Sequence, residues 1–584
     1  MLDNKWKNIK DNMLIICFFG IITTLLTVVF IKLGTIILNS DGSFHFSRLE
    51  ELYQDFRNGS MAFIASHTFN STGVGTFLFY PSILLYPWVI LRLIFSPVTA
   101  FYIWYGLMLF VTMCIAYYSM WLFDKDRIRA IFFGVLYSIF PYHIHLGVVH
   151  TVIGEFLAYT FMPLLFVGLY YCLTNKEKWY LLGISWSLIL YSHVISAYMT
   201  ILCVIIISII YVLTDPQSIK RTIINLSKNA VLVILLSSFI LVPFITDFIN
   251  AGINSPNSET FGFLDTLQNI VGISLTNTAD SNKSIGILAL FTVIVGWYFV
   301  KDSRTKEKVI YGLGVFFLLC TSTVVPWQLF NNTVVGKILG VIQFPYRLNT
   351  YAGLFLMVTF SLIISRFIHS IANKKARVLF NIGIMIFLII SYYGSLTSLF
   401  VKIHTSQGNL LKNNTELTAF IPNDAVIKKE NYNNIFKYII LYGETDYYPK
   451  AAFNKFENNI SEEVNPKINS ILLHKVIVDG KEKVKIPKVA SNCIEYNVKV
   501  DKKEKIDVPV LAYKRTTVML NEKNINYAIS SRGTVVVDGN KGNNRISVSY
   551  QPSKLLYIGM MVSVITWIGL FIGLIFSKKD KLIR

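Results

Sequence analysis

Charged residues are scarce in this chain. Only 15% of its 584 residues are Asp, Glu, Lys or Arg, whereas a soluble domain carries roughly 25%. Hydrophobic residues make up 53%, and the mean hydropathy is +0.52. A water-soluble fold is therefore excluded, and the apolar runs of about 20 residues predict helices that cross a membrane.

Cysteine is also scarce, with six in the whole chain. Five of them lie in apolar runs and Cys493 stands alone in a polar region, so neither a disulfide framework nor a zinc-binding spacing is present. A small-residue cleavage site is missing after the basic N-terminal segment. We therefore expect the first apolar run to be retained as a span rather than removed as a signal peptide.

The net charge of +20 is concentrated in short loops between apolar runs, which indicates membrane topology and argues against a nucleic-acid partner. About twelve spans are predicted. They cover approximately residues 13–38, 100–123, 129–142, 155–173, 179–193, 196–213, 228–249, 285–300, 308–328, 347–367, 378–400 and 555–576.

The apolar segment at 76–96 contains Pro81 and Pro87, and we predict that it does not cross the membrane. With this choice every basic loop lies on the cytoplasmic side, as do both termini. The loop at 39–99 and the region at 401–553 then lie outside the cell. The predicted domains are a transmembrane domain (1–400), an extracytoplasmic domain (401–553), and a final span with a basic tail (554–584).

Residues 401–553 are polar and contain short alternating runs such as EYNVKV and GTVVVDG. Seven or so such runs predict a compact β-sandwich-like domain. Asp479–Gly480 and Asp538–Gly539 are predicted hairpin turns. The fold class is therefore a polytopic α-helical membrane protein with an extracytoplasmic β-rich domain before its last span.

The first candidate site follows the first span, in the sequence DGSFHFSRLEELYQDFRNG. In a helix, Asp41, His45 and Arg48 would share one face. They would offer a base, a proton carrier and a cation able to bind phosphate. A second interpretation stays open, in which Ser40 or Asp41 only caps an interfacial helix.

A second candidate site combines His143, His145 and His150 with Glu155. Three histidines and a carboxylate can bind a metal ion or relay protons, or they can be ordinary hydrogen-bonded loop residues, and the spacing does not decide between these. Glu155 is more informative, because a carboxylate at the start of a span needs a partner or a wet cavity.

Further candidates are Arg347 with Gln343, and His193 in a tight turn. Arg347 can grip a lipid phosphate or can extend to the membrane interface, and His193 fits an accessory or a structural role. The acidic, aromatic sequence YGETDYYP predicts a weak acceptor-binding cluster. Its members are Glu444, Asp446, Tyr447 and Tyr448.

Several of these motifs together resemble a known superfamily. They are DGSFHFSRLEELYQDFRNG, GVVHTVIGEFLAYTFMPLL, YSHVIS and QFPYR, combined with a first span and a C-terminal ectodomain. The combination is similar to the GT-C superfamily of polyprenyl-phosphate-dependent membrane glycosyltransferases. Within it, the chain resembles bacterial YfhO-like proteins and the membrane proteins described, misleadingly, as pyruvoyl-tetrahydropterin synthase-related.

This resemblance implies an inverting enzyme of the bacterial cell membrane. It would transfer a sugar from undecaprenyl phosphate or a similar lipid to an envelope glycan such as teichoic acid. Asp41 would be the general base, with His45 and Glu155 as further catalytic residues. Arg48, Arg347 and Gln343 would bind the donor phosphate.

Two departures from the superfamily pattern limit what can be carried over. Asp41 is followed by Gly42 rather than by a second acid, and the WWD-type motif of protein N-glycosylation is missing. No definite cofactor is predicted, and a divalent metal ion stays open. The alternatives are a lipid-linked glycan transporter or flippase, an O-antigen-type polymerase or ligase, and a non-enzymatic glycan-binding scaffold.

Overall fold

A computed structural model describes residues 2–39, 41–174, 177–249, 251–254, 261–406, 409–414, 419–440, 443, 445–453 and 465–583. The chain divides into two units. The helical unit comprises Met1–Asn39, Phe95–Ala230 and Asn257–Asn409. The loop–sandwich unit comprises Ser40–Ile94, Val231–Pro256 and Leu410–Arg584.

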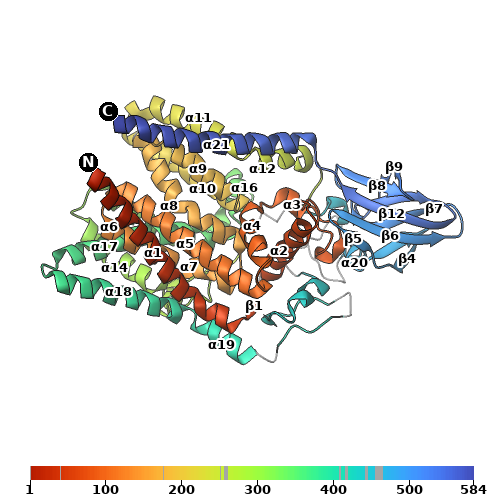
Figure 1. Cartoon of the computed structure of the whole chain (residues 1–584), viewed down its shortest axis with the longest axis horizontal. Coiled ribbons are helices and arrows are strands. Elements are labelled where there is room, and N and C mark those ends of the chain that lie inside the picture. The colour runs from red at the N-terminus through yellow and green to blue at the C-terminus, as the bar shows by residue number, and fades with distance from the viewer. Residues whose placement is uncertain are drawn as a thin grey trace. The chain divides into compact units, whose positions relative to one another are not determined.

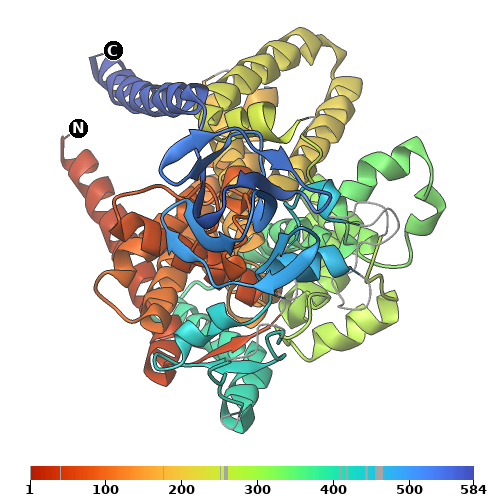
Figure 2. The same ribbon diagram turned by 90° about the vertical axis from the view of Figure 1, so that its right-hand side faces the viewer.

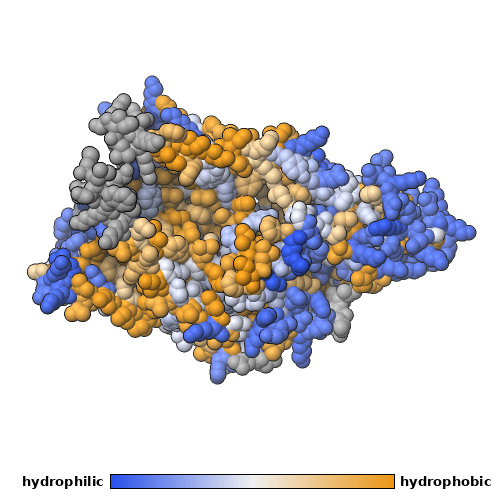
Figure 3. All heavy atoms as spheres, viewed as in Figure 1, coloured by the Kyte–Doolittle hydropathy of each residue, from blue (hydrophilic) through white to orange (hydrophobic). Residues whose placement is uncertain are grey.

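Long apolar helices build the helical unit (Figure 1). Their sequences form helices because lipid offers no hydrogen-bond partners to the backbone. Large side chains on their surface are apolar and exposed, among them Ile209 (54%), Ile294 (72%) and Leu379 (70%). Figure 3 shows hydrophobic residues in orange over much of the face of the helices that it presents, as expected for surfaces that contact lipid. The longest are α1 (Leu2–Leu33), α5 (Pro97–Asp124), α8 (Ile153–Thr174), α10 (Val194–Thr214), α17 (Asn349–Ser370) and α18 (Lys374–Ser395).

Other helices of the predicted spans are bent or short. The chain bends by 46° after α6 (Arg127–Ser138), where Pro141 begins α7 (Pro141–Ile144) and the π-helix η3 (His145–Val149). A second bend of 73° separates α11 (Ile219–Leu236) from α12 (Ser238–Pro243) and η5 (Phe244–Phe248). The short helices are α9 (Tyr180–Leu190), α14 (Gly286–Val300) and α15 (Thr305–Cys320).

Among the described residues, seven helices are long and apolar enough to cross a membrane, or nine if each bent pair is one span. The predicted count of twelve is therefore not confirmed, because α9, α14 and α15 have only 11, 15 and 16 residues. The predicted class, a polytopic helical membrane protein with a β-rich C-terminal region, is confirmed.

A buried ion-pair network holds several of these helices together. The guanidinium of Arg129 is fully buried and donates to both carboxylate oxygens of Glu307 at 2.9 Å. It also donates to Asp124 at 2.5 Å. The network joins α6 to α15 and to the end of α5, and its two-pronged geometry offsets the cost of burying the charges.

The loop–sandwich unit begins with helix α2 (Gly42–Arg57), followed by α3 (Thr76–Phe79) and α4 (Tyr86–Arg92). The apolar helix over Ile83–Arg92 is ten residues long and reaches only about 15 Å, half of a bilayer's hydrocarbon core. A helix of this length is too short to cross a bilayer, which agrees with the prediction that residues 76–96 do not span the membrane. The same unit contains the last helix, α21 (Lys554–Ile583), which packs on α12, with Gly559 against the backbone of Ser238.

Two five-stranded antiparallel sheets form the β-sandwich of this unit (Figures 1 and 2). The strand orders are β10-β11-β7-β3-β4 and β5-β6-β12-β8-β9. Alternate residues such as Ile494, Val508 and Ile546 are fully buried between the sheets. The strands are β3 (Lys475–Val478), β4 (Lys481–Val484), β5 (Lys488–Ala490), β6 (Cys493–Val500), β7 (Glu504–Leu511), β8 (Thr516–Leu520), β9 (Lys523–Ile525), β10 (Ala528–Ile529), β11 (Thr534–Gly539) and β12 (Gly542–Tyr550).

One predicted hairpin turn is confirmed and the other is wrong. Asp479 and Gly480 join β3 to β4, and both have positive φ (49° and 77°), as a type I′ turn requires. Asp538 and Gly539 instead pair with Lys505 and Glu504 as the last residues of β11. The chain turns after them, at Asn540 and Lys541, and enters the other sheet.

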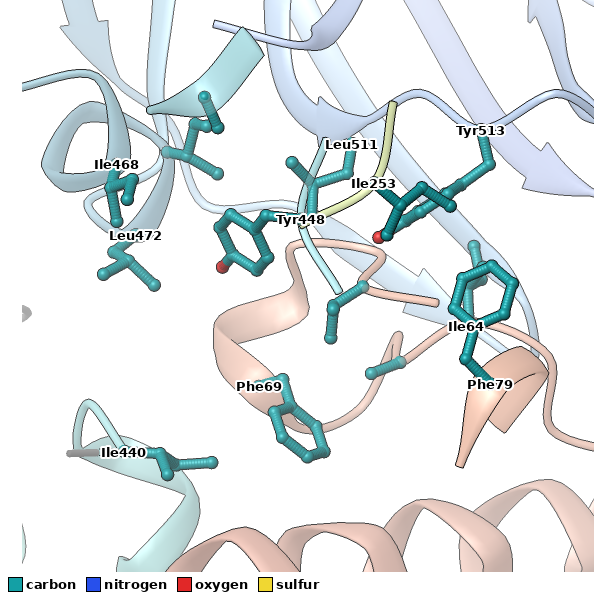
Figure 4. Close-up of a cluster of buried hydrophobic side chains, with 14 of the residues drawn as sticks. Ile64, Phe69, Phe79, Ile253, Ile440, Tyr448, Ile468, Leu472, Leu511 and Tyr513 are labelled. Carbon is teal, nitrogen blue, oxygen red and sulfur yellow. The ribbon is translucent and has the colours of Figure 1, made fainter. Parts of the chain in front are cut away.

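A second hydrophobic core joins the segment after α2 to the sandwich (Figure 4). Phe69 and Phe79 pack in the same cluster as Tyr448, Leu511 and Tyr513. Polar contacts fix the same junction. The side-chain oxygen of Asn492 accepts from the backbone N–H groups of Phe63 (2.7 Å) and Ile64 (3.2 Å), and the backbone N–H of Leu511 donates to the carbonyl of Thr72 (2.9 Å).

Candidate functional site

The first candidate residues lie on helix α2. Asp41 occupies the N-cap position, but its side chain makes no capping hydrogen bond, so capping does not explain the carboxylate. Ser40 lies outside the described residues. Helix α2 contains no proline, and from Gly42 to Tyr53 every residue is buried. His45 and Arg48 follow on the same face and are each 1% exposed.

Arg48 is held by neutral partners in a fully buried position. Its Nη2 donates to the carbonyl of Pro81 at 2.6 Å, and its guanidinium lies 4.0 Å from the ring centre of Tyr80. Its Nε has no hydrogen-bond partner among the described residues. Burial lowers the pKa of Arg48 to about 10, so the side chain keeps its positive charge at neutral pH.

His45 completes this group. Arg48 Nη1 lies 3.2 Å from His45 Nδ1, and because a guanidinium only donates, Nδ1 is the acceptor and the ring proton sits on Nε2. The imidazole also contacts the rings of Phe44 and Tyr80 edge to face. The sequence-predicted trio is thus partly linked, with Arg48 fixing the tautomer of His45.

The structure brings part of the predicted acceptor cluster to this group. Gly443, three residues before Asp446, lies against the side chain of Phe44 of α2. Burial, and after it the charge of Asp41, raise the pKa of Asp446 to about 6. Tyr447 interacts electrostatically with Arg48, and its carbonyl accepts from the Tyr513 hydroxyl at 2.8 Å. Tyr448 is instead part of the hydrophobic core in Figure 4. Glu444 lies outside the described residues.

The second candidate site lies in the helical unit, where α8 begins. Glu155 is 4% exposed, and its Oε1 accepts from the Tyr142 hydroxyl at 2.7 Å. Its Oε2 lies 3.4 Å from Nε of Arg347. The buried carboxylate therefore has the partners that its place at the start of a span requires. No sequence signal pointed to the role of Tyr142, because its contact with Glu155 depends on the bend of the chain at Pro141.

Gln343 positions Arg347 through an unusual turn. Gln343 has φ 63° and ψ −55°, and the N–H of Phe344 donates to the carbonyl of Ile342 at 2.7 Å. This is a classic γ-turn, which is rare and strained for a non-glycine residue. Arg347 Nη1 donates to the Gln343 side chain (2.8 Å) and to the Ile342 carbonyl (3.0 Å). The predicted pair is thus a direct contact.

The histidines fall into different environments. His145 stacks on His150 with ring centres 4.3 Å apart and lies parallel to Tyr142, the hydrogen-bond partner of Glu155, at 6.1 Å. His145 Nδ1 donates to the carbonyl of Ala279 at 2.9 Å. His143 lies away from this group, stacked on Phe156 and Tyr159 of α8.

His193 has a capping position. It is the N-cap residue of α10, and its Nδ1 accepts from the backbone N–H of Ser196 at 3.3 Å. This contact satisfies one of the free N–H groups at the start of the helix. The geometry accounts for the residue without a role in catalysis.

An apolar cavity of about 530 Å³ lies elsewhere in the helical unit. It is lined by residues near the end of α8 opposite Glu155, including Leu169 and Leu173, and by Phe355 of α17. Lys306 is one of few charged residues in its wall. The cavity fits a hydrocarbon chain and holds none of the predicted site residues.

The raised pKa of Asp446 predicts a pH-dependent stability. Because folding favours the protonated carboxyl, its stabilising contribution is complete below pH 4 and is lost as the pH rises through 6. The change is at most about 3 kcal/mol, and less because the carboxyl is partly exposed. Asp446→Asn should therefore melt at a higher temperature than the wild type at pH 8 and at the same temperature at pH 4.

The control is Asp479→Asn, in an exposed hairpin turn of the same unit. This variant should melt like the wild type at both pH values. Equal melting temperatures of Asp446→Asn and the wild type at pH 8, measured by differential scanning fluorimetry of the purified protein, would contradict the cost of the Asp446 charge in the folded protein, which comes first from burial and then from Asp41.

Comparison with solved structures finds distant similarities. The mycobacterial arabinofuranosyltransferase AftD has 12% identity and a TM-score of 0.43, with 66% of this chain and 26% of that chain covered. This chain thus spans about a quarter of the length of AftD. The oligosaccharyltransferase AglB from Archaeoglobus fulgidus, solved with an inhibitory peptide and a dolichol-phosphate, has 11% identity and a TM-score of 0.42, with 81% and 70% covered.

Comparison with sequences gives a family. No curated protein matches this chain. The model of a family described as "6-pyruvoyl-tetrahydropterin synthase related domain; membrane protein" matches residues 77–401, which is more than half of the chain. This finding confirms the family to which the sequence motifs pointed. The chain therefore belongs to the family of membrane proteins with a 6-pyruvoyl-tetrahydropterin synthase related domain.

Proposed function

We propose that this protein is a GT-C-type glycosyltransferase of the bacterial cell membrane. It moves a sugar from an undecaprenyl-phosphate-type lipid to an envelope glycan outside the cell, such as teichoic acid or another surface polymer. The observation that carries the proposal is the group on α2, where Asp41 is the N-cap residue and is followed on the same helix by the contact between His45 and the buried cation Arg48. Such a group offers both a proton acceptor and a phosphate-binding charge.

The chemistry assigned to this group is a single displacement with inversion. The acceptor hydroxyl gives its proton to Asp41, and its oxygen forms a bond to the anomeric carbon of the donor sugar. The bond from that carbon to the phosphate oxygen breaks, and its electron pair leaves with the lipid phosphate. Asp446 supplies a second carboxylate to this group. Asp446 and Tyr447 both hydrogen-bond the acceptor.

Cations stabilise the departing phosphate. We assign this role to Arg347, with Gln343 as its positioning residue. Nη1 of Arg347 is occupied by two protein contacts, whereas Nη2 makes no hydrogen bond within the described part of the chain, which leaves it for a phosphate oxygen. Arg48 is the second assigned cation. Glu155 balances the charge of Arg347, and His45 carries protons.

The contacts inside the loop–sandwich unit support the proposed topology. The rings of Phe244, Phe248 and Tyr447 lie 6.3, 5.3 and 5.8 Å from that of Phe79, which supports one common side of the membrane for these four residues. An even number of crossings must therefore separate each segment from the next. Six crossings lie between Phe79 and Phe244 if the short helix α9 crosses. Four crossings lie between Phe248 and Tyr447 if α14 and α15 both cross. This gives the ten spans predicted between residues 97 and 400.

Asp41→Asn should abolish sugar transfer, because the amide cannot take the acceptor proton. The expected loss is about 10²–10⁴-fold in rate, the usual contribution of a general base. The measurement is the content of the envelope glycan modification in cells that carry only the variant, with protein amount in the membrane checked by immunoblot. Asp479→Asn serves as the matched control and should transfer normally. Full modification in cells carrying only Asp41→Asn would sink the assignment.

Arg347→Ala should raise the concentration of lipid donor needed for half-maximal transfer. Loss of a charge-assisted contact to phosphate costs about 1.5–3 kcal/mol, which corresponds to roughly 10- to 100-fold. The measurement is the dependence of the initial rate on donor in isolated membranes. Lys337→Ala removes an exposed cation from the nearby helix α16 (Val334–Leu339) and should leave the curve unchanged. An unchanged donor requirement in Arg347→Ala would show that the Arg347 side chain only extends to the membrane interface and does not bind the donor.

A further inference from the structure

A second cluster of metal-binding side chains lies on helix α2, away from Asp41. Glu51 and Asp55 are one helical turn apart, and His67 lies in the loop that packs against this turn. One ligand atom from each of the three residues lies within 4.8 Å of the others, and His67 Nε2 is 3.7 Å from Asp55 Oδ1. Asp41 precedes Glu51 by ten residues, which is about 15 Å along a helix.

The Asp55 carboxylate is the observation that points to a ligand. Asp55 is fully buried, and neither of its carboxylate oxygens accepts a hydrogen bond from the described residues. The Ser491 hydroxyl is the polar group that interacts with this carboxylate, and it makes no hydrogen bond of normal geometry to it, although it accepts from Asn58 at 3.1 Å. A buried carboxylate without hydrogen bonds is costly, so such groups are normally paired or coordinate a metal ion.

His67 is the second side chain with an unused atom in the cluster. Its Nε2 is buried and accepts no hydrogen bond within the described ranges. Nε2 is the nearest nitrogen to the Asp55 carboxylate. A nitrogen and an oxygen ligand atom thus face each other.

Glu51 is already oriented by donors. Its two oxygens accept from the backbone N–H groups of Ser66 (2.7 Å), His67 (2.9 Å) and Thr68 (2.7 Å), and from the hydroxyls of Ser66 (3.0 Å) and Thr68 (2.8 Å). The hydroxyls can rotate away and free a lone pair, while the N–H groups keep the carboxylate in place. Ligating carboxylates usually have hydrogen bonds of this kind.

We propose that Glu51, Asp55 and His67 bind one divalent transition-metal ion of the Zn²⁺ type. An imidazole nitrogen beside two carboxylate oxygens favours such an ion over Mg²⁺ or Ca²⁺, which prefer oxygen ligands alone. Bonds of about 2.0–2.1 Å place tetrahedral ligands about 3.4 Å apart. The 3.7 Å between Asp55 and His67 therefore needs to close by only a few tenths of an ångström.

The ion would fasten α2 to the loop that follows it. It would balance the negative charge of the two carboxylates and tie the turn at residues 51–55 to residues 66–68, whose N–H groups already contact Glu51. The role is structural and does not depend on the proposed sugar transfer. Its test therefore needs no activity assay and stands whether or not the transferase proposal holds.

The test is Zn²⁺ binding by the purified full-length protein in detergent, after EDTA treatment and removal of the chelator. Competition against a fluorescent zinc indicator should give one equivalent bound to the wild type, and Zn²⁺ should raise the melting temperature. Asp55→Asn and His67→Asn should each bind Zn²⁺ at least 100-fold more weakly. Exposed His404 supplies the control, and His404→Asn should bind like the wild type.

Asp55→Asn also separates a loss of Zn²⁺ binding from a failure of the variant to fold. Without metal this variant removes an unpaired buried charge, so it should melt no lower than the metal-free wild type and should gain nothing from Zn²⁺. Three results would overturn the proposal. They are no bound Zn²⁺ in the wild type at about 100 µM free ion, an affinity of both variants equal to that of the wild type, or displacement of Zn²⁺ by equimolar Mg²⁺.

Discussion

The burial of a polar helix is the constraint on which the loop–sandwich unit depends. Helix α2 has few apolar residues, yet most of its side chains are buried, including Arg48, Glu50, Glu51 and Asp55. Each buried charge must find a partner, because an unpaired one costs several kcal/mol. Arg48 finds the Pro81 carbonyl and the Tyr80 ring, and Glu51 finds three backbone N–H groups. The segments that supply these partners are thereby fixed around the helix.

The same constraint acts in the helical unit. Glu155 and Arg129 are buried in apolar helices inside the helical unit, and each has partners from other helices or turns. Arg129 bridges two carboxylates and so has a fixed, structural geometry. Arg347 is different, because its contact with Glu155 is long and its Nη2 stays unused within the described chain. A cation of this kind can gain a further partner without losing those it has.

The fold class could be predicted from sequence because apolar runs and alternating strands are local signals. The number of spans could not, since α9, α14 and α15 carry apolar sequence but end after a few turns. Asp479–Gly480 was a correct turn because both residues take positive φ. The equally plausible Asp538–Gly539 continues a strand, because its neighbours on β7 supply the pairing. Strand pairing is a tertiary property that the dipeptide does not encode.

The candidate sites show the same division between local and tertiary information. Asp41, His45 and Arg48 share a helix face, and Gln343 and Arg347 share a turn, so spacing was enough to group them. The contact of Gly443, three residues before Asp446, with Phe44 of α2, some 400 residues earlier in the chain, depends on the packing of the core in Figure 4. No sequence motif pointed to His67, because its partner Asp55 lies on helix α2, which ends before His67 in the sequence.

The central claim, that this protein transfers sugar by a single displacement, is tested most directly by the stereochemistry of the product. The measurement is the anomeric configuration of the transferred sugar, read by NMR after transfer from a polyprenyl-phosphate donor of known configuration. One carboxylate base acting on the acceptor predicts the configuration opposite to that of the donor. A product with the donor's configuration would contradict this account.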